Sequence, residues 1–362
     1  MTYRYNPFEI AVCGEPPERR AALMAGIAAL YAGTHTIGHV MERGPQLEAD
    51  TAERLGVNLV YGDGQHGLLY PSKLDEYLPP RPLLEVDLVL AECSADNELP
   101  KVVAVEGGLA SEYRHVLAYV GDPASCPVLP SGARYLTTAQ TLELKQVLDE
   151  HFDSMTRAAR LNGLVLVGGK STRMNRDKAA LEYHGKPQAL RCHELLSGVC
   201  DEVFISSRAE QASEPIYTGL RTIPDAFLGL GPLGGILSAL QFDPAASWFV
   251  LACDLPFVTQ AVLRHLVEAR NPMKLATAYV SAYDGYPEPL CAIYEPKSIH
   301  RLLGFLAMGY QCPRKVLINS DTWLVEPVDR HALDNVNRPE EFERAKDRLG
   351  AQRRAEVSVE FQ

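Results

Sequence analysis

The chain has 362 residues, of which 46% are hydrophobic and 22% are charged, the profile of a globular protein long enough for two domains. No apolar run approaches the roughly 18 residues that a membrane helix needs, and the N-terminus lacks the basic-then-apolar pattern of a signal peptide. We therefore expect a cytoplasmic protein with no membrane partner. The eight cysteines include no C-x-x-C pair, so a zinc or disulfide framework is not expected.

The net charge of −11 is distributed unevenly along the chain. Residues 1–158 contain 12 basic and 22 acidic side chains, whereas residues 159–362 contain 23 and 24. Because phosphate backbones attract basic surfaces, we do not expect nucleic acid as a partner. The asymmetry indicates two separate units, which we place at 1–155 and 159–362.

The first unit is predicted to begin as a strand, a glycine and a helix. "FEIAVCG" is a short apolar strand that ends at Gly14, and apolar residues then recur on one helical face over 18–33. An amphipathic helix is predicted over 138–152, and the polar segment 153–162 is predicted to be a linker. Further buried strands are predicted over 57–62, 86–93, 99–108 and 112–122. This pattern is typical of an α/β domain.

The second unit shows the same alternation of strands and helices. "GLVLVGG", "DEVFISS" and "SWFVLACDLPF" are predicted strands, and the helical pattern "TQAVLRHLVEAR" follows the last of them. The fold class that we predict is therefore α/β, with two doubly wound, mostly parallel-sheet domains. Ligands in such sheets bind beyond the carboxyl ends of the strands, so the segments after the strands are the candidate site.

A glycine-rich basic segment, "GGKSTRMNRDK", follows the first strand of this unit. Glycines allow backbone N–H groups to approach a ligand, and N–H groups that open a helix favour anions. Arg173 and Lys178 would add full charges, and a guanidinium can grip phosphate with two hydrogen bonds. The alternative is a solvated basic loop. Five cations fall within 17 residues and favour phosphate binding: Lys170, Arg173, Arg176, Lys178 and Lys186.

Two aspartates follow later strands. Asp254 ends the strand in "LACDLPF", and a carboxylate that faces a polyphosphate usually holds Mg²⁺ together with the phosphates. It might instead cap a helix, but Thr259 is better placed for that role. Asp225 precedes the segment "GLGPLGG", whose glycines would let a base or ribose lie against the backbone. An ordinary turn before a helix is the alternative for that segment.

These motifs together resemble the molybdenum cofactor guanylyltransferases. The resemblance covers roughly residues 160–347 and rests on G-G-x-S-x-R-M-x-x-D-K, G-K-P, P-D…G-P-L-x-G-I and C-D-x-P-F in that order, followed by "PEPLCAIY" and "NVNRPEEFERA". It implies a Rossmann-like nucleotidyltransferase fold in the C-terminal domain. It also implies transfer of GMP from GTP to molybdopterin, which yields molybdopterin guanine dinucleotide and pyrophosphate.

The resemblance also implies roles for individual residues. Lys178 and Arg173 are expected to contact the triphosphate, and Asp254 is expected to hold Mg²⁺ and act with them in catalysis. Asp225 is expected to bind the nucleoside, and Asn337 is a weaker candidate for metal or substrate. The remaining expected nucleotide contacts come from the end of the strand and its turn: Leu166, Val167, Gly168 and Gly169.

Two departures from the family pattern leave alternatives open. Asn175 replaces a usual glycine in the loop, and Ser206, Ser207 and Arg208 stand where an asparagine is often found near the nucleotide. The alternatives are CMP transfer to molybdopterin, nucleotide transfer to a sugar phosphate, or a non-catalytic molybdopterin carrier. For the second substrate, Arg314 and Lys315 are the basic candidates, and a surface pair that opens a helix is the other interpretation.

The first unit resembles the small P-loop GTP-binding protein of molybdopterin dinucleotide synthesis. "DLVLAECSADNELPKVVAVE" and "GDPASCPVLP" carry this resemblance. The phosphate-binding loop is degenerate, because Arg19, Arg20 and Ala21 stand where G-K-[ST] is expected. We therefore predict that this domain does not hydrolyse GTP and acts as a scaffold or docking module, with apo-molybdoenzymes as candidate partners.

Overall fold

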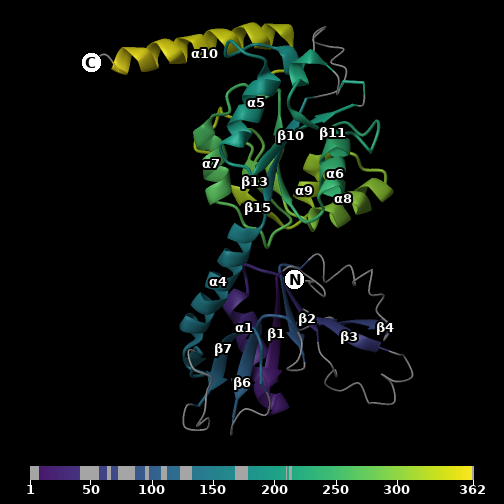
Figure 1. The fold of residues 1–362 in the computed structure, drawn as a ribbon, viewed down its shortest axis with the longest axis vertical. Helices are drawn as coiled ribbons and strands as arrows, with labels where there is room; N and C mark the ends of the chain where they lie inside the picture. The colour runs from purple at the N-terminus through teal and green to yellow at the C-terminus, as the bar shows by residue number, and fades with distance from the viewer. Residues whose placement is uncertain are drawn as a thin grey trace. The chain divides into compact units, whose positions relative to one another are not determined.

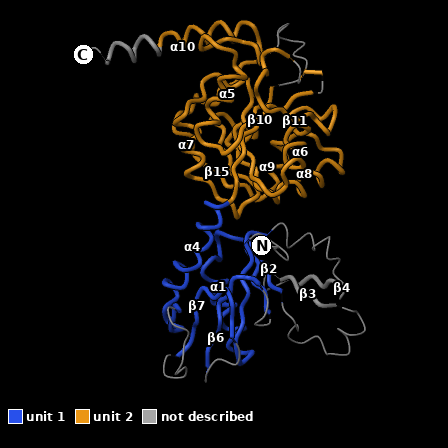
Figure 2. The backbone as a smooth tube through the Cα atoms, viewed as in Figure 1, with its two compact units in different colours: residues 1–158 blue, residues 159–362 orange. Residues whose placement is uncertain are grey.

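A computed structural model describes residues 8–40, 57–62, 67–71, 86–93, 98–106, 112–122, 133–167, 178–208, 210–211 and 214–360. The chain divides into two compact units, unit 1 at Met1–Ala158 and unit 2 at Ala159–Gln362 (Figure 2). Within the described ranges, no helix combines the length and apolar character needed to cross a bilayer.

Unit 1 contains a six-stranded sheet in the order β2-β5-β1-β6-β7-β8. Every neighbouring pair in this sheet is parallel. The segment 57–62 is not part of it, because β3 pairs only with β4 in a separate antiparallel hairpin. The strands are β1 (Glu9–Gly14), β2 (Ile37–Val40), β3 (Val57–Gly62), β4 (Gly67–Pro71), β5 (Leu88–Glu92), β6 (Lys101–Val105), β7 (Val116–Gly121) and β8 (Tyr135–Leu136).

Two helices of unit 1, α1 (Pro17–Tyr31) and α4 (Thr141–Ala158), pack side by side. Phe152 of α4 contacts the ring of Tyr31 with centroids 6.2 Å apart, and the Tyr31 hydroxyl donates to Asp149 Oδ1 at 2.8 Å. The linker expected over 153–162 is wrong, because α4 continues to Ala158 and the next strand starts at Leu161. The polar residues in that segment occupy the last turns of the helix.

Unit 2 contains a seven-stranded sheet in the order β11-β10-β9-β12-β14-β13-β15. The four strands at one side of this order are mutually parallel, and β14 runs antiparallel to both of its neighbours. The predicted mostly parallel α/β fold is therefore confirmed. The strands are β9 (Leu161–Leu166), β10 (Glu202–Ser207), β11 (Arg221–Pro224), β12 (Ser247–Ala252), β13 (Ala276–Val280), β14 (Pro287–Tyr294) and β15 (Thr322–Val325).

Helices cover both faces of this sheet (Figure 1). Val165 and Ile205 belong to the core beneath α5 (Gln188–Ser197) and α7 (Gln260–Glu268), whereas Leu164 and Phe204 belong to the core on the opposite face. This alternation follows from the two-residue period of a strand. The helices of the second face are α6 (Pro232–Phe242), α8 (Ser298–Ala307) and α9 (Pro313–Ile318). The chain continues into α10 (Pro339–Glu360).

Thr259 caps α7 as predicted. Its side chain accepts a hydrogen bond from the Val262 amide at 3.4 Å, which satisfies a donor that the first helical turn leaves unpaired. Asp254 is therefore not needed as the cap of this helix.

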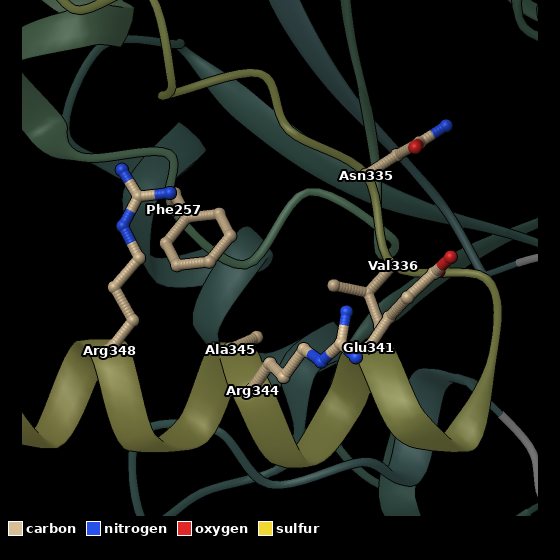
Figure 3. A pocket seen from close by; sticks show the side chains of 7 residues that line it. All are labelled: Phe257, Asn335, Val336, Glu341, Arg344, Ala345 and Arg348. Carbon is tan, nitrogen blue, oxygen red and sulfur yellow. The ribbon is translucent and has the colours of Figure 1, made fainter.

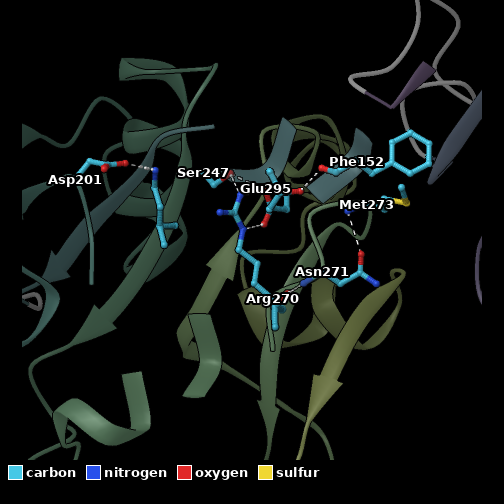
Figure 4. A network of polar contacts seen from close by, with 10 residues as sticks. Phe152, Asp201, Ser247, Arg270, Asn271, Met273 and Glu295 are labelled. Carbon is cyan, nitrogen blue, oxygen red and sulfur yellow. Dashed lines mark hydrogen bonds and ion pairs between the residues drawn. The ribbon is translucent and has the colours of Figure 1, made fainter. Parts of the chain in front are cut away.

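A buried ion pair lies at the amino-terminal edge of β12 (Figure 4). Arg270 Nε and Nη2 contact Glu295 Oε1 and Oε2 at 2.7 and 2.8 Å, and Ser247 Oγ donates to Glu295 Oε2 at 2.6 Å. Burial lowers the pKa of Arg270, but the charge and hydrogen bonds of Glu295 more than offset it, so the net shift is upward. The pair is far along the strands from the carboxyl edge, which indicates a structural role.

Candidate active site

Four parallel strands of unit 2 end at a common edge. Leu166 at the end of β9 is in register with Ser206 of β10 and with Ala252 of β12, and Ser207 is in register with Pro224 of β11. The Cys253 amide donates to the Leu166 carbonyl at 3.2 Å, so the chain leaves β9 and β12 side by side. The segments after these strands therefore start from the same edge of the sheet, beyond the carboxyl ends of the strands, where ligands of such sheets bind.

The basic segment after β9 is only partly described. Leu166 and Val167 are buried at its start, and Lys178 begins the short 3₁₀ helix η2 (Lys178–Ala180). Residues 168–177 lie outside the described residues, and so does the side chain of Lys178. The roles expected for Gly168, Gly169 and Arg173, and the effect of Asn175, therefore remain predictions.

Asp225 is fixed at the end of β11 by β10. Its amide donates to the Ser207 carbonyl at 2.9 Å, and its Oδ1 accepts a hydrogen bond from Ser206 Oγ at 3.0 Å. Ser206 thus orients the carboxylate, a role that the sequence did not reveal because the two residues are 19 positions apart. Ser207 Oγ is buried and has no hydrogen-bond partner among the described residues.

The glycines that open α6 serve packing as well as access. A Cβ on Gly234 would lie 2.4 Å from the Phe227 carbonyl oxygen, and one on Gly235 would lie 2.5 Å from Ser206 Oγ. These distances are shorter than van der Waals contact, so glycine is required for α6 to approach the strand ends. Gly231, the residue before the helix, has φ +57°, in the region that favours glycine.

Asp254 follows β12 directly and is half-buried at the same edge. Its carbonyl accepts a hydrogen bond from the Val336 amide at 2.8 Å. Burial and then the charges of Asp254 and Glu341 raise the pKa of Tyr183, which places both carboxylates near that ring. Tyr183 itself lies shortly after Lys178, so the chain around Asp254 and the chain after the basic loop are neighbours.

The donor set suits a metal that is shared with substrate phosphates. No group of three or more His, Cys, Asp or Glu side chains in the described part of the chain is arranged to hold a metal by itself. Asp225 and Asp254 follow β11 and β12, which lie three strand spacings, or roughly 14 Å, apart in the sheet, so we do not expect the two side chains to share one ion. Mg²⁺ is commonly held by one or two carboxylates plus phosphate oxygens, which Asp254 alone would satisfy.

The two basic candidates for the second substrate are engaged by the protein. Arg314 Nη1 and Nη2 pair with Asp284 at 3.0 Å and with Glu288 at 2.7 Å. Lys315 Nζ lies 3.8 Å from the centre of the Tyr310 ring. These contacts favour the surface-pair interpretation of Arg314 and Lys315 over a phosphate contact.

In unit 1, the residues at the degenerate loop form an internal ion pair. Arg20 Nη2 lies 2.6 Å from Glu92 Oε1 at the end of β5, and its Nη1 donates to the Gly14 carbonyl at 2.8 Å. Glu15 adds a second carboxylate at 3.2 Å. The guanidinium that might have held a phosphate is therefore neutralised by side chains of the same edge.

This chain is similar to a known domain family and to several named proteins. The model of the MobA-like NTP transferase domain matches residues 163–322. A molybdenum cofactor biosynthesis bifunctional protein of Synechocystis is 36% identical over 50% of this chain and 52% of its own length. A probable molybdenum cofactor guanylyltransferase of Pelotomaculum thermopropionicum is 34% identical over 39% of this chain and 66% of its own length. The chain thus spans less than two thirds of both relatives.

Another relative is covered almost completely. A probable molybdenum cofactor guanylyltransferase of Opitutus terrae is 34% identical over 52% of this chain and 95% of its own length. Among solved structures, molybdopterin-guanine dinucleotide biosynthesis protein A of Archaeoglobus fulgidus aligns at 25% identity and a TM-score of 0.45, over 52% of this chain and 99% of that one. Through its MobA-like domain, the chain belongs to the family of the molybdenum cofactor guanylyltransferases.

Proposed function

We propose that this chain transfers GMP from GTP to molybdopterin in a Mg²⁺-dependent reaction that releases pyrophosphate. The observation that carries the proposal is the shared edge of one sheet at which the chain leaves the parallel strands β9, β11 and β12, toward the basic loop, Asp225 and Asp254 respectively. Membership of the guanylyltransferase family supports GTP and molybdopterin as the substrates.

In the proposed reaction, the terminal phosphate oxygen of molybdopterin attacks the α-phosphorus of GTP. A new P–O bond forms, the bond to the β-phosphate bridging oxygen breaks, and pyrophosphate leaves with the electron pair. The attacking phosphate is already ionised near neutral pH, so no strong general base is required. Positioning and charge neutralisation supply most of the acceleration.

Each candidate residue has a defined part in this reaction. Asp254 would hold Mg²⁺, which when bound neutralises charge that develops on the phosphates. Lys178 and Arg173 would stabilise the departing pyrophosphate. Asp225, oriented by Ser206, would accept hydrogen bonds from the nucleoside. Leu166, Val167, Gly168 and Gly169 would line the base and ribose through their backbone.

Nucleotide preference tests the substrate assignment. With Mg²⁺ present, GTP at 100 times its dissociation constant is expected to stabilise unit 2 by about 2.7 kcal/mol, and CTP, UTP and ATP much less. Thermal unfolding followed by tryptophan fluorescence measures this, because Trp248 and Trp323 both lie in unit 2. Pyrophosphate release with GTP and molybdopterin is the matching activity assay. A larger shift with CTP would favour cytidylyl transfer, and absence of release would favour a carrier.

We propose that unit 1 does not bind or hydrolyse nucleotide and serves as a scaffold or docking module, with apo-molybdoenzymes as the proposed partners. The Arg20–Glu92 pair supports this, because it neutralises the cation beside the degenerate loop. Calorimetric titration of the full chain with Mg²⁺ is expected to give one GTP site, and the affinity of that site should fall about 10-fold in the Asp225→Ala variant. Two sites, or one whose affinity this substitution leaves unchanged, would contradict the proposal.

A further inference from the structure

An apolar cluster connects the two candidate catalytic segments through the C-terminal helix. Leu181 and Tyr183, just after Lys178, pack with Val336 and with two residues of α10. Phe257, three residues after Asp254, packs against the same cluster. We call it the brace cluster: Leu181, Tyr183, Val336, Ala345 and Leu349, with Phe257 and Phe342 at its border. The segment 334–349 therefore contacts the chain on both sides of the proposed phosphate site.

One backbone hydrogen bond ties this segment directly to Asp254, the residue proposed to hold Mg²⁺. The Val336 amide donates to the Asp254 carbonyl at 2.8 Å. Glu341 Oε2 accepts hydrogen bonds from the amides of Asn337 at 2.7 Å and Arg338 at 3.1 Å. These amides precede the first turn of α10, so the carboxylate fixes how the chain enters the helix. The position of Asp254 thus depends on where α10 begins.

Asp334 connects the same segment to two other elements. Tyr283 Oη, in the turn between β13 and β14, donates to Asp334 Oδ1 at 2.5 Å. Arg348 Nη1 of α10 donates to Oδ2 at 3.2 Å, and His331 Nδ1 lies 3.1 Å from the same oxygen. The side chain of Asp334 is 19% exposed. The hydrogen bond to Asp334 is the main cause that raises the pKa of Tyr283, which keeps the phenol a donor.

Arg348 carries the connection to the loop after Asp254. Its guanidinium lies over the Phe257 ring, 4.6 Å from the ring centre, and Figure 3 shows the two side chains beside each other above α10. A hollow of about 180 Å³ lies between α10 and this loop and is lined by Phe257, Val336, Ala345 and Arg348 among others. The Asp334–Arg348 pair lies beside this hollow and adds a polar contact between the segment at Asp334 and α10.

We propose that Asp334 is a positioning residue for the transfer reaction. By holding Arg348 and Tyr283, it sets α10 and the segment at Val336 against the carbonyl of Asp254, and so fixes the carboxylate that would hold Mg²⁺. This inference rests on the proposed function. Asp334, Val336 and Arg348 lie beyond the part of the chain that the family model matches, 163–322.

The Asp334→Asn variant tests the proposal. Asparagine keeps the size of the side chain and an acceptor for Tyr283, but it removes the charge that Arg348 needs. The concentration of Mg²⁺ for half-maximal activity is expected to rise about 10-fold and kcat to fall about 10-fold, the lower end of the effect of losing a group that orients a metal ligand. The KM for GTP at saturating Mg²⁺ should stay within about 2-fold.

Amide hydrogen exchange tests the same proposal by a measurement that does not depend on enzyme activity. Amide hydrogen exchange at Val336 is expected to quicken about 10-fold in Asp334→Asn, because its bond to the Asp254 carbonyl opens more often. Asp347→Asn is the matched control, since Asp347 is an exposed aspartate on α10, next to Arg348 in the sequence. Arg348→Lys keeps the positive charge, so its Mg²⁺ dependence should stay close to that of the wild type. Arg348→Met removes the charge and should shift the Mg²⁺ dependence as Asp334→Asn does. The double variant of Asp334→Asn with Arg348→Met should change kcat and the Mg²⁺ dependence little more than either substitution alone.

The outcomes separate this proposal from the proposed function. The positioning role would be overturned if Asp334→Asn showed the same amide exchange at Val336 and the same Mg²⁺ dependence as the wild type and Asp347→Asn. This would hold even if the enzyme transfers GMP. Additive effects of the Asp334 and Arg348 substitutions would also overturn it. Absence of pyrophosphate release in the wild-type chain would instead remove the proposed function, while the exchange at Val336 would still report whether Asp334 holds the segment.

Discussion

Replacing Asp254 with alanine is expected to lower kcat for GMP transfer at least about 10³-fold, or about 4 kcal/mol of transition-state stabilisation. Asp254 follows β12 at the edge where the basic loop leaves β9, and no three-ligand group in the described residues would hold the metal in its place. The charge on the transferring phosphates would then be left to the cationic side chains alone. Pyrophosphate release at saturating GTP and Mg²⁺ measures the effect.

Asp225→Ala provides the comparison, because the two aspartates have different predicted parts. Asp225 lies three strands from Asp254 and is oriented by Ser206, so its loss should weaken nucleotide binding in the ground state and transition state alike. The KM for GTP should rise about 10-fold with kcat nearly unchanged. Equal losses of kcat in both variants would mean that the roles are not divided in this way. Tryptophan fluorescence should show that both variants remain folded.

The sequence predicts the edge of unit 2 well because that edge depends on local patterns. Each of the strands β9, β10 and β12 is an apolar run followed by a polar or glycine-rich turn, and parallel pairing brings such ends together. The ends of the strands that precede Asp225 and Asp254 could therefore be expected at the same edge as the end of β9 without any contact information. The cap at Thr259 was equally accessible, since it depends on residues only three positions apart.

Contacts between distant residues were not accessible from the sequence. Ser206 appeared only as a departure from the family pattern, yet it orients Asp225 from the neighbouring strand. Arg20 appeared only as a residue of the degenerate phosphate-binding motif, but Glu92, 72 residues away, pairs with it. No sequence pattern indicates a role for Asp334, because its partners lie in a different turn and on α10. Each of these side chains has its role through the fold and not through its neighbours in the chain.

The prediction of a linker over 153–162 was wrong for a different physical reason. Polarity over 153–162 suggested an exposed connection, but the last turns of a helix are often polar because only one face is buried. Arg157 lies in the last turn of α4, where its charge is favourable near the carbonyl end of a helix. Polar composition therefore cannot distinguish the end of an amphipathic helix from a linker.

The largest effect on stability is expected from Glu295→Ala, which should lower the free energy of unfolding of unit 2 by about 3–5 kcal/mol. The substitution leaves Arg270, with 7% of its side chain exposed, without the carboxylate that pairs with it, and it removes the acceptor of Ser247. An unpaired charge in such a place cannot be hydrated without opening the edge of the sheet where β12 starts and β14 ends. Urea unfolding followed by tryptophan fluorescence isolates this unit.

The double substitution of Arg270→Met with Glu295→Leu distinguishes the cost of an unpaired charge from the value of the pair. Removing both charges also removes the desolvation cost, so the double variant should be clearly more stable than Glu295→Ala and close to the wild type. Glu202→Ala, which breaks an exposed pair with Arg221, should change unfolding little and serves as the control. A double variant as unstable as Glu295→Ala would show that the network contributes specific hydrogen bonds that apolar side chains cannot replace. Since this network and the proposed site lie at opposite ends of β12, the Glu295 variants should alter stability while leaving the Mg²⁺ dependence of the folded enzyme unchanged.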